Sequence, residues 1–260
     1  MPKVSVITTV YNGEGHLREA IQSVLDQEYG DYEYIIVDDG STDGTGAVVT
    51  SFRDARIVYL PIARSGRGVA LNKALEAARG DYIAVLDADD IAFGYRLRRQ
   101  VNFLDDHADC QVLCGNNKIM EPTPAPDVSD AWRKIEAAEF ARRNVVSHST
   151  VMMRARALRS VGGYDAARKC LFDYELWYRL ASAGCAFYKL DSALVFKRIH
   201  GGQFFEGKNR FHVLVQSVTV KLCFYRRFSR RKSDIFYIVA GFVYGLLPAF
   251  VRRKFMEKLK

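Results

Sequence analysis

The sequence is poor in the residues that define small secreted, fibrous or disordered proteins. Of 260 residues only five are cysteine and six are proline, and no repeat or low-complexity tract is present. The cysteines are scattered and predict no disulfide framework, and Cys110 and Cys114 lack the second cysteine or histidine pair of a zinc site. No secretory signal precedes the first apolar segment. We therefore expect a globular protein in the reducing environment of the cytoplasm.

The positive charge of the chain is concentrated in its C-terminal part. The formal net charge is +8, but residues 197–260 carry 15 Lys+Arg and three acids, a net of +12. Residues 1–196 are therefore slightly acidic, at −4. This asymmetry favours an anionic partner for the tail, either a membrane surface or a nucleic acid.

Short apolar runs alternate with amphipathic stretches in the first half of the chain. Four buried strands are predicted, at residues 4–10, 34–37, 57–60 and 82–86, and the helices between them include residues 17–25 and 69–78. This alternation is typical of βαβ units, so we predict an α/β fold with a mainly parallel sheet flanked by helices. Ligand sites in such sheets lie at the carboxyl ends of the strands.

After residue 120 the pattern is less regular. It predicts, in order, a loop, a helix, a strand, a second helix and an extended segment, at residues 121–130, 131–142, 149–154, 173–183 and 194–200.

Carboxylates gather where two of the predicted strands end. Asp38 and Asp39 follow the second strand, and Asp87, Asp89 and Asp90 follow the fourth. Such oxygen ligands suit Mg2+ or Mn2+, which bind one or two protein carboxylates together with substrate phosphates. The alternative is that these acids only form turns and cap the next helix, which fits the first pair better than the second group. Three like charges within four residues repel unless a cation compensates them.

Eight short motifs follow one another between residues 4 and 202. They are VSVITTVYN (4–12), IQSVLDQ (21–27), VDDGSTD (37–43), NKAL (72–75), GDYIAVLDADD (80–90), VGGYD (161–165), DYELW (173–177) and RIHGG (198–202). In this order and spacing they resemble the family 2 glycosyltransferases of the GT-A fold. The resemblance implies a Rossmann-like α/β domain and inverting transfer of a sugar from a nucleotide diphosphate-sugar.

The resemblance assigns the nucleotide-sugar to residues at the ends of the strands. Thr9 and Tyr11 would hold the nucleotide base, Thr9 through its backbone and Tyr11 by stacking. Asp39 would accept a hydrogen bond from the base, in such enzymes often from N3–H of uracil. Asp87 would bind the ribose, and a UDP-linked sugar is the expected donor.

The same resemblance implies a divalent cation, Mn2+ or Mg2+, that is bound by Asp89 and bridges the diphosphate. Such a cation neutralises charge on the departing nucleoside diphosphate. His200 would approach the metal or the diphosphate, or would be an ordinary partly buried histidine. Arg67, just before the helix at 69–78, could reach the base or a phosphate, and Arg64 competes with it by position.

Inverting transfer also needs a base that removes a proton from the acceptor hydroxyl. The family places Glu-Asp at the start of a helix here, whereas this chain has Phe172 and Asp173, so Asp173 stands in the place of the base. The alternative is that Asp173 only caps its helix. His148 matches a family position near the acceptor cleft, and Trp177 is a weaker candidate for acceptor binding. Each of these two could instead be a structural residue of the core.

An uncharged run at residues 235–251 lies between two basic clusters, at 226–232 and 252–254. It is at the lower limit of a spanning length, glycine and proline interrupt it, and both flanks are basic. We therefore expect a peripheral segment on an anionic membrane surface, with packing on the catalytic domain or a partner, or a true span, as alternatives. The predicted domains are a GT-A domain at 1–203, whose halves are nucleotide-sugar-binding (1–118) and acceptor-binding (119–203), and a basic helical tail at 204–260.

Together these observations predict an inverting, metal-dependent hexosyltransferase at the inner face of the cell membrane. Its acceptor would be a saccharide or lipid-linked saccharide of cell-envelope polysaccharide biosynthesis. A nucleotidyltransferase is the alternative enzyme class, but residues 9–13 lack the Gly-rich basic signature that grips a triphosphate. A nucleic-acid-binding protein that uses the basic tail is the third class, and we expect no nucleic-acid partner. No Gly-x-Gly-x-x-Gly follows the first strand, which argues against a dinucleotide enzyme.

Overall fold

The computed structural model describes residues 1–119, 128–198, 210–247 and 251. The chain divides into two compact units. Unit 1 comprises residues 1–135 and 146–199, and unit 2 comprises residues 136–145 and 200–260. The loop predicted at residues 121–130 falls largely outside the described residues.

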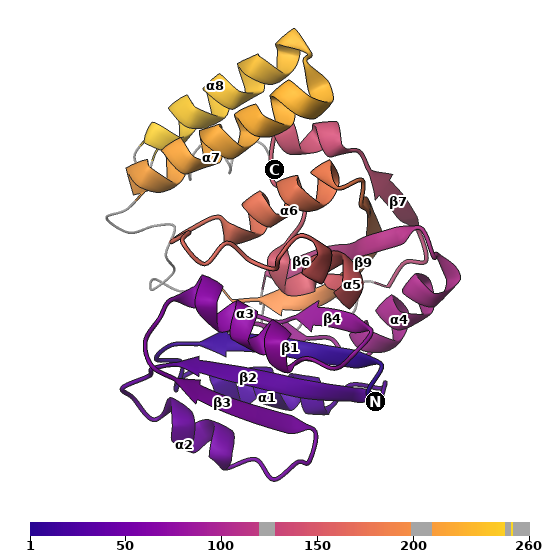
Figure 1. Ribbon diagram of the computed structural model, residues 1–260, viewed down its shortest axis with the longest axis vertical. Helices are drawn as coiled ribbons and strands as arrows, with labels where there is room; N and C mark the ends of the chain where they lie inside the picture. The colour runs from indigo at the N-terminus through magenta and orange to yellow at the C-terminus, as the bar shows by residue number, and fades with distance from the viewer. Residues whose placement is uncertain (120–127, 199–209, 248–250, 252–260) are drawn as a thin grey trace. The chain divides into compact units, whose positions relative to one another are not determined.

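The described part of unit 1 contains a nine-stranded sheet (Figure 1). Its first half is parallel, in the order β3-β2-β1-β4, and consists of β1 (Val4–Val10), β2 (Tyr32–Asp39), β3 (Ile57–Ile62) and β4 (Tyr82–Val85). All four predicted strands are confirmed. Their carboxyl ends lie at one edge of the sheet, where the acidic motifs begin. Strands β2 and β4 are buried along their whole length because parallel strands are covered on both faces.

Beyond β4 the sheet continues with mixed pairings. In order these strands are β8 (Met152–Arg154), β6 (Cys110–Ile119), β9 (Ala186–Lys197) and β5 (Ile91–Ala92), and β7 (Trp132–Ile135) also pairs with β9. Strand β4 is antiparallel to β8, whereas β6 runs parallel to β9. Strand β5 begins directly after Asp90 and pairs with the end of β9. Immediately after the acidic motif the chain therefore passes from β4 to β5, which lies beside β9.

The helices of unit 1 follow the crossover rule for parallel strands. They are α1 (Leu17–Leu25), α2 (Thr45–Thr50), α3 (Arg67–Ala77), α4 (Arg96–Asp106), α5 (Ala155–Ser160) and α6 (Phe172–Ser182). Leu17, Ile21 and Val24 of α1 are buried, as their spacing predicts. Right-handed crossovers put α1 and α2 on one face of the parallel strands and α3 on the other. Figure 1 shows α3 in front of these strands and α1 behind them.

The predicted helix at residues 131–142 is wrong. The chain instead forms strand β7, followed by a short 3-10 helix, η1 (Ala137–Ala141). Strand β7 pairs antiparallel with β9, Trp132 opposite Leu190, and the Trp132 ring packs edge-on against Phe103 at 5.5 Å between centroids. These partners lie far away in the sequence, so the local Ala/Glu-rich pattern did not indicate a strand.

Two other predicted elements have different boundaries. The predicted strand at 149–154 begins only at Met152, after a 3-10 turn at His148–Thr150. Strand β9 begins at Ala186, well before the extended segment predicted at 194–200, and residues 199 and 200 lie outside the described residues.

The described residues of unit 2 form a helical hairpin with η1 packed against it. Helix α7 (Arg210–Phe224) ends in a π-helical turn at Tyr225–Ser229, and α8 (Lys232–Leu246) follows. Phe224 stacks on Phe140 of η1 at 4.8 Å between ring centroids. The buried Asp234 accepts a hydrogen bond of 2.6 Å from Arg142. The predicted basic and apolar helical tail is thus present as two packed helices.

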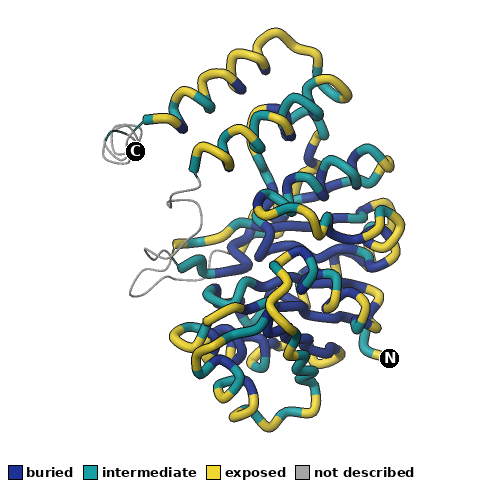
Figure 2. The backbone as a smooth tube through the Cα atoms, turned by 60° about the vertical axis from the view of Figure 1, so that its left-hand side comes forward, coloured by how far each residue is buried: buried dark blue, intermediate teal, exposed yellow. Residues whose placement is uncertain are grey.

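Much of α8 faces solvent, and most of its exposed residues are apolar (Figure 2). They include Phe236, which is 69% exposed, and also Ile235, Tyr237, Val239, Val243 and Leu246. Across the described ranges, no helix has both the length and the apolar character that crossing a membrane requires.

Candidate active site

Three carboxylates meet just beyond the carboxyl end of β4. One ligand atom each from Asp87, Asp89 and Asp90 lies within 4.8 Å of the other two. Asp90 is 1% exposed and accepts hydrogen bonds from the Ser149 hydroxyl at 2.6 Å and the Arg198 backbone N–H at 3.2 Å. Burial, together with the charges of Asp87 and Asp89, raises the pKa of Asp90 to about 7. Full ionisation of this cluster therefore requires a compensating cation.

The buried Arg96 supports this edge of the sheet from behind. Its guanidinium donates to the carbonyl oxygens of Val85 at 2.7 Å and Val151 at 3.2 Å, and to the Gln100 side chain at 3.0 Å. Burial lowers the pKa of Arg96 to about 10, so its charge is retained at neutral pH. Arg96 thereby fixes the end of β4 against the segment that carries His148 and Ser149.

Arg67, the first residue of α3, supplies one positive charge to the cluster. It forms an ion pair with Asp87, and its guanidinium lies 4.9 Å from the centre of the Phe172 ring. Burial alone would raise the pKa of Asp87, but the charge of Arg67 holds it below its usual value, with help from His148 and Lys197. Phe172, where the resemblance led us to expect an acid, thus supports the cation that pairs with Asp87.

His148 presents an unsatisfied ring nitrogen beside the carboxylates. Its Nε2 is 2.9 Å from the Tyr164 hydroxyl, and its Nδ1 lies 4.0 Å from an oxygen of Asp87. Nδ1 is buried and has no hydrogen-bond partner among the described residues. Burial lowers the pKa of His148 to about 4, so the imidazole is neutral at physiological pH. A neutral, orphaned nitrogen at this position is available to a bound group.

Tyr164 is held in place by a glycine turn and an asparagine. The Asn72 side chain accepts from the Tyr164 backbone N–H and donates to its carbonyl oxygen, both at 2.8 Å. Gly163, at φ +71°, lies so close that a Cβ there would stand 2.6 Å from the Asn72 oxygen. Two of the motifs, NKAL and VGGYD, therefore act together to orient the partner of His148.

These donors fit a divalent cation. Carboxylate oxygens dominate the cluster, and the orphaned imidazole adds the nitrogen ligand that Mn2+ accepts. Asp87, Asp89 and Asp90, with His148, are the described residues that could hold the ion. His200, the other predicted metal ligand, lies outside the described residues.

A second buried carboxylate lies at the end of β2. Asp39 is 2% exposed and accepts backbone hydrogen bonds from Ser65 at 2.7 Å and Gly66 at 3.0 Å, and it forms an ion pair with Arg64. The backbone at Arg64 can approach the end of β2 closely because residue 40 is glycine, at φ +73°. A Cβ there would stand 2.6 Å from the Arg64 backbone nitrogen.

Arg64 connects this carboxylate to an exposed aromatic ring. Its guanidinium lies 3.8 Å from the centre of the Tyr11 ring, and Tyr11 is 46% exposed. Thr9 is partly buried near the end of β1, opposite Val37 of β2. The sequence left Arg64 and Arg67 as competitors for one role, and the structure gives each its own carboxylate, Asp39 and Asp87 respectively.

The predicted base and acceptor residues lie on or beside α6. Asp173 is in the first turn of α6, and its charge is close enough to oppose the lowering of the His148 pKa. Trp177 is fully buried, with its ring 6.1 Å from the rings of both His148 and Phe187. Trp177 therefore presents no open surface to a ligand in this structure.

The structure thus brings together Arg67, Asp87, Asp89, His148 and Asp173, and it places Thr9, Tyr11 and Asp39 at the neighbouring strand ends. Sequence reasoning missed the contribution of Tyr164 and Ser149. A signal for Tyr164 was present in the VGGYD motif, whereas nothing in the sequence tied Ser149 to Asp90.

Comparison with known proteins identifies glycosyltransferases by family model and by sequence similarity. The model of glycosyl transferase family 2 matches residues 5–162. A putative glycosyltransferase of Bacillus subtilis, EpsE, is 32% identical over 263 residues, which cover 99% of this chain and 94% of that protein. The putative teichuronic acid biosynthesis glycosyltransferase TuaG, also of Bacillus subtilis, is 36% identical over 157 residues, 58% of this chain and 62% of TuaG.

Solved structures share the fold at low sequence identity. Residues 1–349 of TarS from S. aureus, in complex with UDP-GlcNAc, superpose with a TM-score of 0.67 at 20% identity, covering 94% of this chain and 72% of that one. The mannosyltransferase PcManGT from Pyrobaculum calidifontis, in complex with GDP-Man and Mn2+, gives a TM-score of 0.68 at 17% identity, covering 99% and 80%.

Proposed function

Because this chain belongs to glycosyltransferase family 2, we propose that it is an inverting enzyme that transfers a sugar from a UDP-sugar to a saccharide or lipid-linked saccharide. The name of TuaG supports an acceptor in cell-envelope polysaccharide biosynthesis, and the TarS complex supports a uridine nucleotide. The single observation that carries the proposal is the convergence of Asp87, Asp89 and Asp173 at one edge of the sheet.

Donor binding would use the residues at the ends of β1, β2 and β4. A uracil ring would stack on Tyr11 and donate its N3–H to Asp39, with Thr9 contributing backbone contacts. Arg64 now lies on the Tyr11 ring and pairs with Asp39, so it must move aside when the base binds. Asp87 would then bind the ribose, and Arg67 would lie close to the diphosphate.

Transfer would use Asp173 as the base. Its carboxylate takes the proton of the acceptor hydroxyl while the hydroxyl oxygen bonds to the anomeric carbon. The bond from that carbon to the diphosphate oxygen breaks, and its electron pair leaves with the nucleoside diphosphate. Arg67 supplies positive charge beside the leaving group. A divalent cation held by Asp89 and its neighbours would neutralise further charge there as a Lewis acid.

Thermal stabilisation of the full-length protein tests the proposal. UDP-GlcNAc and UDP-glucose should raise the Tm in the presence of Mn2+, since a ligand at a hundred times its Kd stabilises the folded state by about 2.7 kcal/mol. In EDTA the increase in Tm should be much smaller, because the cation that bridges protein and diphosphate is removed. GDP-mannose is the matched control, with the same diphosphate and a different base. Stabilisation by GDP-mannose alone would show that the nucleotide assignment is wrong, and stabilisation by no nucleotide-sugar would contradict the donor site itself.

We also propose that unit 2 attaches the protein to the cytoplasmic face of an anionic membrane. Helix α8 exposes an apolar surface, and the basic cluster at residues 226–232 lies directly before it. Apolar side chains that insert at the interface and cations that contact anionic headgroups are the two components of peripheral membrane binding.

A further inference from the structure

A basic cavity lies at the edge of the sheet opposite the carboxylates. It has a volume of about 480 Å³, within the range of small-molecule sites. Its walls come from the start of β1, the turn before β4, the end of α4 and the junction of β8 with α5, all of unit 1. Asp81 precedes β4 whereas Asp87 follows it, so at about 3.3 Å per residue the two sites lie about 15–20 Å apart.

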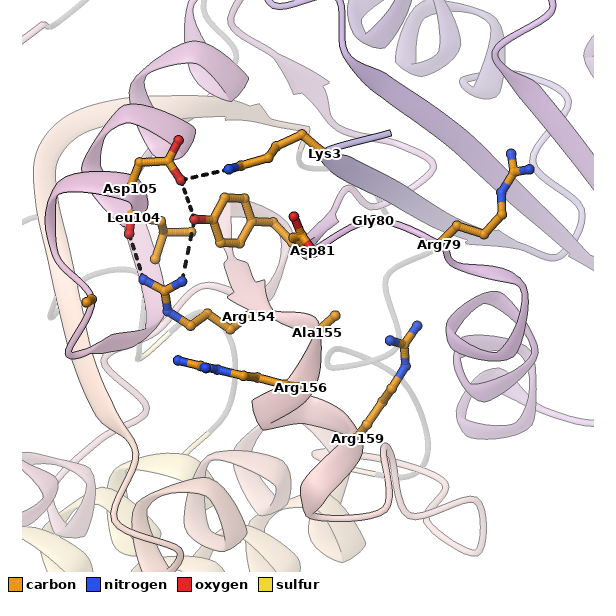
Figure 3. Close-up of a pocket in the computed structure, with 12 residues that line it drawn as sticks. Lys3, Arg79, Gly80, Asp81, Leu104, Asp105, Arg154, Ala155, Arg156 and Arg159 are labelled. Atoms are coloured by element: carbon orange, nitrogen blue, oxygen red, sulfur yellow. Dashed lines mark hydrogen bonds and ion pairs between the residues drawn. The ribbon is translucent and has the colours of Figure 1, made fainter. Parts of the chain in front are cut away.

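Five cationic side chains and two carboxylates line this cavity (Figure 3). The cations are Lys3, Arg79, Arg154, Arg156 and Arg159, and the carboxylates are Asp81 and Asp105. Figure 3 shows Arg154, Arg156 and Arg159 projecting from one wall, with Lys3 and Arg79 on the other.

Two of the cations are already neutralised by carboxylates. Lys3 pairs with Asp105 at 3.1 Å, and Arg79 pairs with Glu33 at 2.6 Å. These two pairs contribute no net charge to the cavity.

The other three arginines keep their charge. Arg154 donates to the carbonyl oxygens of Leu104 at 2.6 Å and Cys110 at 2.8 Å, and Arg159 donates to that of Ala78 at 2.6 Å. Carbonyl groups orient a guanidinium without neutralising it. Arg156 is exposed and has neither a hydrogen bond nor an ion pair within the part of the chain that the structure describes.

We propose that this cavity binds a phosphate or diphosphate group. Three arginine charges face one carboxylate, Asp81, that forms no ion pair with any residue the structure describes, so the cavity has a net positive charge. Guanidinium groups bind phosphate oxygens through paired N–H donors. Arg156 and Arg159 retain such donors, whereas Arg154 contributes charge, because its nitrogens donate to the carbonyl oxygens of Leu104, His107 and Cys110 and to the Tyr82 hydroxyl. The site is separate from the donor site of the proposed function, and its ligand is either a soluble phosphate ester or an anionic lipid headgroup.

Calorimetric titration of the full-length protein with inorganic pyrophosphate in EDTA tests this proposal. Without a divalent cation the carboxylates beyond β4 repel the anion, so one binding event should remain. Arg156→Glu should weaken binding about tenfold or more, because it replaces a positive charge in the cavity by a negative one. The side chain is exposed, so the change costs no packing contact. Arg53→Glu, which makes the same charge change on an exposed arginine elsewhere, should leave it unchanged.

A second variant separates binding from folding. Asp81→Asn removes the carboxylate that opposes the arginines and should tighten pyrophosphate binding about threefold, a gain that a misfolded protein would not show. The proposal is overturned if wild-type protein gives no binding heat or if Arg156→Glu binds as well as wild type. Displacement by phosphatidylglycerol vesicles, but not by phosphatidylcholine vesicles, identifies a lipid headgroup as the source, and no displacement by either identifies a soluble phosphate.

Discussion

Arg64 and Arg67 show how two arginines three residues apart acquire opposite roles. Arg67 is the first residue of α3 and pairs with Asp87 beside the position proposed for the diphosphate, where a cation helps the donor. Arg64 lies on the Tyr11 ring and pairs with Asp39, the two groups proposed to receive the base, where it would compete with the donor. Their environments, rather than their chemistry, distinguish them.

Arg64→Ala should therefore strengthen UDP binding. In the wild type the donor must displace Arg64 from its cation–π contact and from an ion pair that is partly open to solvent. Without these contacts to break, the free energy of UDP binding should improve by about 1 kcal/mol, which corresponds to a roughly fivefold lower Kd. Arg67→Ala should do the reverse. Calorimetry with UDP and Mn2+ measures both, and weaker binding by Arg64→Ala would mean that Arg64 contacts the nucleotide directly.

Asp173→Asn tests the base. Asparagine keeps the shape of the side chain but cannot take the proton, so transfer should fall by a factor of about 100 to 10,000. Donor affinity should change little, because the base faces the acceptor. Loss of UDP-sugar binding with normal residual turnover would assign Asp173 to the donor site instead.

Asp89→Ala tests the metal site. The variant should lose about a thousandfold or more in transfer rate, because several kcal/mol of charge stabilisation on the departing diphosphate depend on the bound cation. Excess EDTA should reduce wild-type activity similarly and have little further effect on the variant. Full wild-type activity in EDTA would contradict metal dependence.

At the level of elements, the turn after α5 can be tested through its two glycines. Gly162 and Gly163 both have positive φ, at +79° and +71°, but only Gly163 has a neighbour where its Cβ would be. Gly162→Ala should cost about 1 kcal/mol in unfolding free energy from backbone strain alone, and Gly163→Ala should cost more because it also displaces Asn72. Urea denaturation compares them. Equal losses would show that the contact with Asn72 is unimportant for stability.

The parallel strands were predictable because their signal is local. Strands β1, β2 and β4 are largely apolar runs, and β2 and β4 lead into acidic motifs, so no distant partner is needed to recognise them. Strand β7 was not predictable, since Ile135 is its one buried residue and its pairing with β9 spans more than fifty residues. The same holds within the site. Asp87 and Asp89 follow from a motif, whereas the contact of Ser149 with Asp90 exists only in the folded chain.

At the scale of the whole molecule, the two ends of the parallel sheet have opposite electrostatic character. Carboxylates gather at the carboxyl ends of β2 and β4, and arginines gather near the amino end of β4. In the proposed function a negatively charged donor would be bound at the acidic edge with the help of a cation, whereas the basic edge would hold an anion directly. The net charge of residues 1–196, −4, does not reveal this division.

The basic C-terminal helices give the last prediction. The triple variant Phe236→Ser, Val239→Ser and Val243→Ser should fold, because these side chains are 69%, 55% and 53% exposed, and should lose most of its flotation with phosphatidylglycerol vesicles. Ile119→Ser, at a residue of unit 1 that is 59% exposed, is the matched control and should float like wild type. High salt alone should release the wild type only in part, since salt screens the basic cluster but not apolar insertion. If the triple variant floats with the vesicles as well as wild type does, or if the wild-type protein does not bind anionic vesicles, the exposed face of α8 does not bind membrane.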